Sequence, residues 1–133
     1  MSPGGLFMEF IIVYLFGAAL YGTIEVLCRG WTHWSMLILG GACFSLMYML
    51  SATSLPFILK LSISSLCITA LEFGTGCLVN IILEWQIWDY SGNALNIMGQ
   101  ICPLFSFYWF MLSVPGIILC SFMHRAMPLL LEA

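Results

Sequence analysis

The sequence predicts an all-α, polytopic membrane protein with four transmembrane helices in an antiparallel bundle. Of 133 residues only three are basic and six acidic, 62% are hydrophobic, and the mean hydropathy is +1.08, whereas about a quarter of the residues of a soluble domain are charged. The apolar residues form four runs of about the 20 residues that cross a 30 Å hydrocarbon core. Because strands of a membrane barrel need only about 10 residues, these runs indicate helices. We therefore expect a single transmembrane domain over residues 1–133.

Helix-breaking and charged residues mark the ends of the apolar runs. The first run stops at Arg29-Gly30, and the second is closed by a turn-prone stretch ending in Pro56, which cannot donate a backbone hydrogen bond. Pro103 suits the first turn of the last helix, and Pro115, to which we assign a structural role, should kink that helix. The expected spans are residues 6–27, 35–52, 61–83 and 101–123.

The distribution of charge predicts the topology. With four spans, both termini and the turn at Lys60 share one side of the membrane, and Arg29 lies on the other. The side with the termini carries two cations, Lys60 and Arg125, and the other side carries only Arg29, which favours cytoplasmic termini. We expect a plasma-membrane protein without a cleavable signal peptide, because no basic segment precedes the first run and that run continues too far.

Several partners and sites are not expected. The net charge of −3 is small and dispersed, which argues against a nucleic-acid partner. The six cysteines form no C-x-x-C motif, and most of them fall in apolar runs, where a thiol packs as a small hydrophobic group. The alternative is a disulfide between Cys28 and Cys102, if both residues face an oxidising compartment. His33 and His124 lie in no zinc-binding pattern, so we expect no metal and no cofactor.

Polar residues recur at helical spacing within the runs, most clearly in the third. Ser62, Ser65, Thr69, Glu72, Gly76 and Asn80 follow one another at steps of three and four, which places them on one helix face. Small and hydroxylated residues such as Gly76 commonly pack membrane helices together, a structural role. Glu72 differs: it lies 11 residues before Leu83, roughly 16 Å at 1.5 Å per residue, near the bilayer midplane. Since a charge there is costly, we expect Glu72 to be protonated, paired or facing a wet cavity, and we assign it to ligand binding.

Glu25 and Arg29 stand four residues apart at the end of the first span. The acid precedes the base, which is the favourable order for an intrahelical ion pair. A plain salt bridge, in which Arg29 is structural, and a ligand site at Glu25 are both open alternatives. The direction of the chain brings Glu25, the Glu72 face and the loop after the third span to the same end of the bundle.

That loop is rich in aromatic and turn-forming residues between Trp88 and Asn96. Trp and Tyr favour the membrane interface. The Asp and Ser of Trp-Asp-Tyr-Ser-Gly-Asn can bond the backbone two residues on, and the following Gly92 and Asn93 tolerate positive φ. These residues predict a tight, self-bonded turn, which can also contact a ligand.

Three segments carry a family resemblance: YGTIEV at 21–26, LEFGTG at 71–76 and WDYSGNALNIMGQICP at 88–103. They resemble the family of small integral membrane proteins known as putative ABC-transporter type IV, over roughly residues 14–120. The usual proline and aromatic residue before Asn96 are here Ala94 and Leu95. The resemblance implies that the family's hallmark positions are here Glu25, Glu72, Trp88, Asp89, Tyr90, Ser91, Asn96 and Gly99. We predict that Gly99 is structural and that the other seven bind the ligand.

No G-x-x-x-x-G-K-[ST] sequence occurs, so a separate ATPase, another membrane subunit or an ion gradient would supply energy. We favour a permease-like or solute-binding protein that moves a cation or a protonated small solute. We expect it to be a homo-oligomer, because one small bundle has little room for a pore.

One alternative is a membrane-embedded enzyme acting on a lipid or isoprenoid, with Glu72 as acid and Asp89 or Glu25 as base. Another is a non-catalytic subunit in which the acids only specify the fold. The favoured hypothesis assigns no catalytic residue.

Overall fold

The computed structural model describes residues 2–132, and helices dominate it. In chain order the elements are α1 (Pro3–Arg29), α2 (Trp34–Ser51), α3 (Phe57–Gly76), the π-helix η1 (Cys77–Ile82) and α4 (Pro103–Leu131). α1, α2, the continuous α3–η1 helix and α4 are each long and apolar enough to cross a membrane. The prediction of an all-α protein with four transmembrane helices is therefore confirmed.

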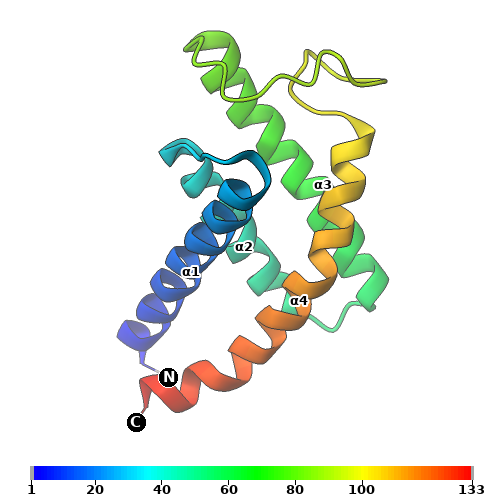
Figure 1. Ribbon diagram of the computed structural model, residues 1–133. Helices are drawn as coiled ribbons and strands as arrows, with labels where there is room; N and C mark the ends of the chain where they lie inside the picture. Colours follow the sequence, from blue (N-terminus) through cyan, green and yellow to red (C-terminus); the bar gives the residue numbers. More distant parts are fainter. Residues whose placement is uncertain (1, 133) are drawn as a thin grey trace.

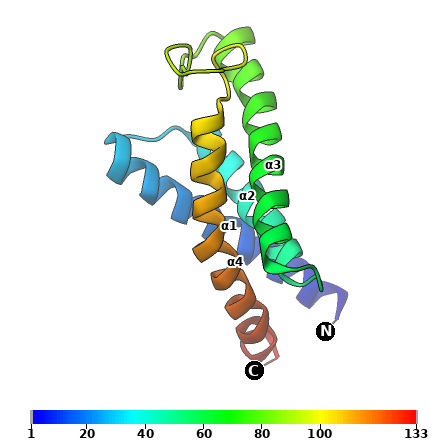
Figure 2. The same ribbon diagram turned by 90° about the vertical axis from the view of Figure 1, so that its right-hand side faces the viewer.

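Successive helices run in alternate directions (Figure 1). Both termini consequently lie at the end that carries the 52–56 turn, and the 83–102 loop lies at the other. α1 packs mainly on α2, α3 packs mainly on α4, and α2 contacts both helices of the second pair. α1 and α4 make little contact with each other, and Figure 2 shows α1 tilted steeply across α3 and α4. Among the helix pairs that pack on each other, α1 and α4 are the most loosely packed.

The helix ends follow the signals in the sequence. Gly30 adopts φ 81° after Arg29, and its N–H donates to the carbonyl of Val26 at 2.8 Å, closing α1 with a left-handed cap. Lys60 Nζ donates to the carbonyl of Ser51 at 3.0 Å, which satisfies a free carbonyl at the end of α2. Pro103 occupies the first turn of α4, as predicted.

α4 is longer than the sequence indicated. We expected it to end near Met123, but it continues through Pro128 to Leu131. The extra turns are held because Met127 is buried in a core cluster with α1 and α2, and a ring nitrogen of His124 lies 2.9 Å from the carbonyl oxygen of Tyr48. Figure 1 shows α4 bending between its yellow start and its red end, and Pro115, which removes one backbone hydrogen bond, lies within it.

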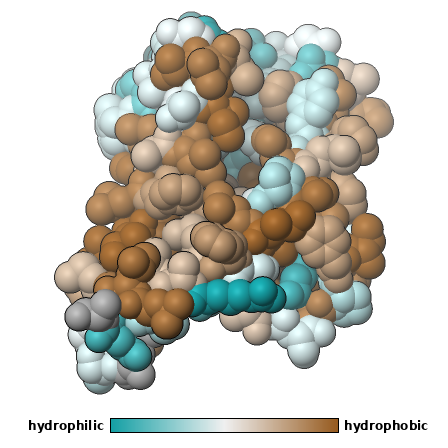
Figure 3. Space-filling view, turned by 60° about the horizontal axis from the view of Figure 1, so that its bottom comes forward, coloured by the Kyte–Doolittle hydropathy of each residue, from teal (hydrophilic) through white to brown (hydrophobic). Residues whose placement is uncertain are grey.

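Large apolar side chains cover the exterior. Figure 3 shows one face that is mostly hydrophobic, with few hydrophilic groups. Phe7, Leu27 and Leu66 are among many large apolar residues that are mostly exposed. A soluble monomer seldom exposes apolar surface on this scale, whereas lipid chains cover it without penalty.

Glycines bring α1 and α2 into close contact. A Cβ atom at Gly17 would lie 2.3 Å from Cβ of Phe44, and one at Gly40 would lie 2.5 Å from Cβ of Tyr21. These neighbours are atoms next to the backbone, which cannot move aside without shifting a helix. The α1–α2 pair therefore depends on the absence of side chains at these positions.

We predict that Gly17→Ala destabilises the protein by about 1–3 kcal/mol, because the added methyl group overpacks the α1–α2 seam. Thermal unfolding in detergent should show a lower midpoint. Gly74→Ala is the matched control: a Cβ there meets no atom within 4 Å. Equal midpoints for the two variants would contradict this account of the seam.

Candidate functional site

The predicted polar face of α3 lies against α4. The hydroxyl of Ser65 donates to the carbonyl of Ser106 at 2.6 Å, and the hydroxyls of Thr69 and Ser106 are 2.8 Å apart. Interhelical bonds of this kind satisfy polar groups that lipid cannot. They fix the rotation of α3 so that Glu72, one turn further on, also points between the helices.

Glu72 is buried and accepts hydrogen bonds at both carboxyl oxygens. Only 3% of the residue is exposed. The hydroxyl of Tyr90 donates to Oε1 at 2.8 Å, and Trp109 Nε1 donates to Oε2 at 2.9 Å. Over residues 2–132, the ion pairs of the structure involve Glu25 and Glu9 but not Glu72. Since a carboxylate offers about four acceptor positions, two remain free.

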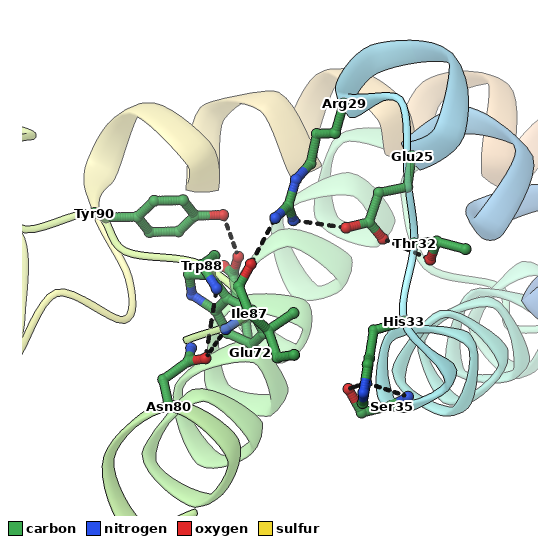
Figure 4. A network of polar contacts seen from close by, with 10 residues as sticks. All are labelled: Glu25, Arg29, Thr32, His33, Ser35, Glu72, Asn80, Ile87, Trp88 and Tyr90. Atoms are coloured by element: carbon green, nitrogen blue, oxygen red, sulfur yellow. Dashed lines mark hydrogen bonds and ion pairs between the residues drawn. The ribbon is translucent and has the colours of Figure 1, made fainter. Parts of the chain in front are cut away.

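The loop folds back to reach this carboxyl group. Figure 4 shows the Tyr90 ring extending from the loop toward Glu72, with the Glu25–Arg29 pair on the neighbouring helix nearby. The Tyr90 ring also stacks on Phe105 of α4, with centroids 4.2 Å apart. Glu72 lies 11 residues before Leu83 along the helix, yet the loop that follows Leu83 contacts it directly through Tyr90.

Glu25 and Arg29 form the predicted ion pair. Arg29 Nη1 lies 2.7 Å from Glu25 Oε1, and the hydroxyl of Thr32 donates to Oε2 at 3.4 Å. Arg29 Nη2 also donates to the carbonyl of Ile87, and the guanidinium sits 4.4 Å from the centre of the Trp31 ring. The hydrogen bond from Arg29 to Ile87 thus ties the end of α1 to the loop, and Glu25 is buried, with 5% of the residue exposed.

Asn80 anchors the loop to η1. Its Oδ1 accepts the backbone N–H groups of Ile87 at 2.7 Å and Trp88 at 3.4 Å, and its Nδ2 donates to Oε1 of Gln100 at 2.8 Å. Trp88 Nε1 donates to the carbonyl of Gln100 at 3.0 Å. The π-helical winding over Cys77–Ile82 sets the direction of Asn80, and such local π segments are frequent at functional sites.

Asp89, Ser91 and Asn96 hold the turn together. The N–H of Ser91 donates to Asp89 Oδ1 at 2.8 Å, and this bond lowers the pKa of the exposed Asp89 carboxyl. Asn96 Nδ2 donates to the carbonyls of Ser91 and Asn93, and its Oδ1 accepts the N–H of Gly99. These three members of the predicted ligand-binding set bond to the loop itself, and none of them lines the two chambers described below.

The predicted tight turn forms at residues 90–93, but the positive φ angles of the loop lie elsewhere. They occur at Glu84 (56°), Gln86 (51°), Leu95 (56°), Met98 (55°) and Gly99 (70°), and not at Gly92 or Asn93. The reason is that the N–H of Asn93 donates to the carbonyl of Tyr90 in an ordinary turn at 2.8 Å. At Gly99, any Cβ would in addition lie 3.0 Å from Asp89 Oδ1, which explains a glycine there.

Two adjoining cavities lie along the α1–α4 seam. The loop-side chamber, about 460 Å³, is lined by Glu25, Arg29, Trp88 and Tyr90 among others. The inner chamber, about 270 Å³, contains Glu72 on its wall. The two share Tyr21, Ile24, Trp109 and Leu112 as lining residues. The remaining walls of the inner chamber include Gly17, Leu20, Cys43, Met47, Pro115 and Leu119.

Sequence reasoning missed Trp109 and Gln100. Trp109 lies between Ser106 and Ser113 at steps of three and four, so the helical spacing of these polar residues in the last span could have indicated its position. Gln100 lies within the loop segment that carries the resemblance, but its bonds to Asn80 and Trp88 join segments that are separate in the sequence.

Sequence reasoning also missed a third buried acid, Glu9, near the termini. The hydroxyl of Tyr48 donates to Glu9 Oε1, and His124 Nδ1 lies 3.9 Å from the same oxygen. The rings of Tyr48 and His124 stack with centroids 3.6 Å apart. Glu9 and Glu25 are 16 residues apart in α1, about 4.4 turns at 3.6 residues per turn, so they lie on nearly opposite sides of the helix. This cluster joins α1, α2 and α4 at one end.

The cysteines and metal-ligating residues form no further site in the described chain. All six cysteines are free thiols, and the disulfide alternative is not formed: Cys28 is exposed, whereas Cys102 is buried beside Asn93. No group of three or more His, Cys, Asp or Glu side chains is placed to hold a metal ion within residues 2–132.

We predict that Gly76→Ala loosens the loop, because a Cβ there would lie 2.6 Å from Gln100 Oε1 and 2.9 Å from Trp88 Cζ2. Cys102, which is 3% exposed, should then react several-fold faster with N-ethylmaleimide, measured by mass spectrometry of its peptide. Gly74→Ala, on the same helix, is the control. Equal reaction rates in both variants would show that the loop is not held at Gly76.

The model of the family described as putative ABC-transporter type IV matches residues 2–132. Neither the curated proteins nor the solved structures contain a match to the chain. The family match covers nearly the whole sequence and agrees with the resemblance in the three quoted segments. The chain, an integral membrane protein, therefore belongs to the putative ABC-transporter type IV family.

Proposed function

We propose that this protein is a permease-like or solute-binding component that binds a cation or a protonated small solute at Glu72. The observation that carries the proposal is a buried carboxyl group on a cavity wall that is hydrogen-bonded by two neutral donors and lacks an ion pair among the described residues. Buried ionisable groups within membrane helices are costly and are commonly retained for function.

The chemistry of the donors favours a positively charged ligand. Trp109 can only donate, so the Glu72 oxygen that it contacts acts as an acceptor. An ammonium group has three donors and no acceptor, and it would complement the free positions on the carboxylate. Arg29 does not supply this charge, because Glu25 and the Ile87 carbonyl already occupy its guanidinium.

The loop would act as a lid. Tyr90 contacts Glu72 directly, and Arg29 joins the loop to α1 through Ile87. Movement of the loop would break both contacts together, so access to the site and the hydrogen bonding of the carboxyl group are coupled. In this proposal Trp88 and Tyr90 face the solute, whereas Asp89, Ser91 and Asn96 give the lid its shape.

We further propose that the protein works in a plasma membrane with cytoplasmic termini and as part of a larger assembly. The chain carries no phosphate-binding loop sequence, so a separate ATPase chain or an ion gradient would drive movement. A homo-oligomer would supply the enclosure that four helices with a loose α1–α4 seam lack.

The test is binding of radiolabelled methylammonium to the protein in nanodiscs, measured over acidic to neutral pH. Wild-type binding should weaken as the pH falls, because a protonated Glu72 no longer attracts the cation. Glu72→Gln should bind at least about tenfold more weakly, a loss of about 1.4 kcal/mol, with no pH dependence. The control is Glu84→Gln, which neutralises an exposed loop acid. Methylammonium binding by Glu72→Gln that equals the wild type at every pH would refute the proposal.

A further inference from the structure

We propose that the ligand is an amphipathic amine, an ammonium head on an apolar chain, and that it enters sideways from the bilayer between α1 and α4. The inference rests on the proposed function, because the head would bind Glu72. It adds the chemical class of the ligand and its route.

The route follows from the packing of the helices. α1 and α4 make little contact and meet near the termini, where Glu9 lies beside His124. Toward the loop, the seam between them is occupied by the two chambers. The seam is thus closed at one end of the molecule and hollow toward the other.

The rim of the hollow part is apolar and exposed. Tyr108, Met111 and Leu112 line the loop-side chamber, and they are between 42% and 51% exposed. When α1 and α4 span a bilayer, apolar side chains exposed on the spanning helices face acyl chains. A small hydrated ion would have to shed its water at such a rim, whereas an amine with an apolar chain already resides in the membrane.

The inner chamber separates a polar end from an apolar end. Its Glu72 carboxyl group has free acceptor positions, while the Ser113 hydroxyl donates to the carbonyl of Trp109 at 2.7 Å and is satisfied. Beyond these groups the wall is formed by side chains such as Leu20 and Leu119. A ligand that fills this space therefore needs one cationic end and an apolar remainder.

The size and the aromatic surroundings agree with this class. Small-molecule sites commonly occupy about 300–1,000 Å³, and the adjoining chambers measure about 270 and 460 Å³. Tyr21 and Trp109, whose ring centroids are 6.2 Å apart, line both chambers. Aromatic faces attract ammonium groups. Calcium, by contrast, takes about 6–8 oxygen ligands, and Glu72 offers one carboxyl group among N–H and O–H donors.

The experiment measures binding of radiolabelled dodecylammonium and methylammonium to the full chain in nanodiscs, with empty nanodiscs subtracted. Leu119→Trp narrows the apolar end of the inner chamber. Leu15→Trp makes the same exchange at a position of α1 that is 60% exposed and lines neither chamber. Leu20→Trp narrows the chamber from the opposite wall, and thermal unfolding identifies any variant that has not folded.

The proposal expects Leu119→Trp or Leu20→Trp to weaken dodecylammonium binding at least about tenfold and to leave methylammonium binding unchanged. Leu15→Trp should affect neither ligand, Glu72→Gln should weaken both, and unlabelled dodecanol should compete poorly because it lacks the charged head.

Three results would overturn the inference. If methylammonium binding depends on Glu72 but both chamber variants bind dodecylammonium like Leu15→Trp, the inner chamber does not hold the apolar chain; the inference then fails and the proposed function stands. If neither amine depends on Glu72, the proposed function fails as well. If the wild type is a dimer that binds no dodecylammonium and Leu119→Trp makes it monomeric, a second copy of the chain occupies the seam.

Discussion

The burial of the Glu72 carboxyl group is the constraint on which the arrangement of this protein depends. A carboxyl group in a helix that crosses lipid must find hydrogen-bond donors inside the protein. One donor comes from Tyr90 in the loop and the other from Trp109 on α4, so three separate elements meet at one side chain. The loop can reach Glu72 only by folding back along η1, and Asn80 and Gln100 supply the bonds that hold it there.

A buried glutamate lies near each end of α1, but only the one at the terminal end brings α1 and α4 into contact. At the terminal end, Glu9 is enclosed by Tyr48 and His124, and the cluster brings α1 and α4 together. At the loop end, Glu25 is neutralised by Arg29, which reaches across to Ile87 rather than to α4. Glycines hold α1 to α2 between these points. α1 is therefore secured to α2, to the loop and to one end of α4, and the remaining length of the α1–α4 seam is hollow.

This asymmetry connects the fold to the proposed function. Membership of the putative ABC-transporter type IV family places the chain among transporter-type membrane proteins, and the geometry of Glu72 supplies a chemical reason for binding a cation. The acidic groups of the site are not equivalent. Glu25 is already paired and stabilises the fold, Asp89 shapes an exposed turn, and Glu72 retains acceptor positions toward a cavity.

Local chemistry along the chain was sufficient to predict the four helices, most of their ends and the buried face of α3. Apolar runs of membrane length, the stop at Gly30, the start at Pro103 and the three- and four-residue spacing of Ser65, Thr69 and Glu72 are all local signals. Such signals depend on helix geometry and on the cost of polar groups in lipid, so they need no knowledge of the partners.

The partners themselves were decided by packing between segments distant in the sequence. No local pattern predicts that Tyr90 bonds to Glu72, that Arg29 bonds to the carbonyl of Ile87, or that His124 extends α4 by packing on Tyr48. The predicted turn forms at residues 90–93, yet the positive φ angles that residue preference allowed at Gly92 and Asn93 occur at other loop residues, among them Leu95, Met98 and Gly99. A local pattern specifies which side chains need a partner, and only the folded chain determines which partner lies within hydrogen-bonding distance.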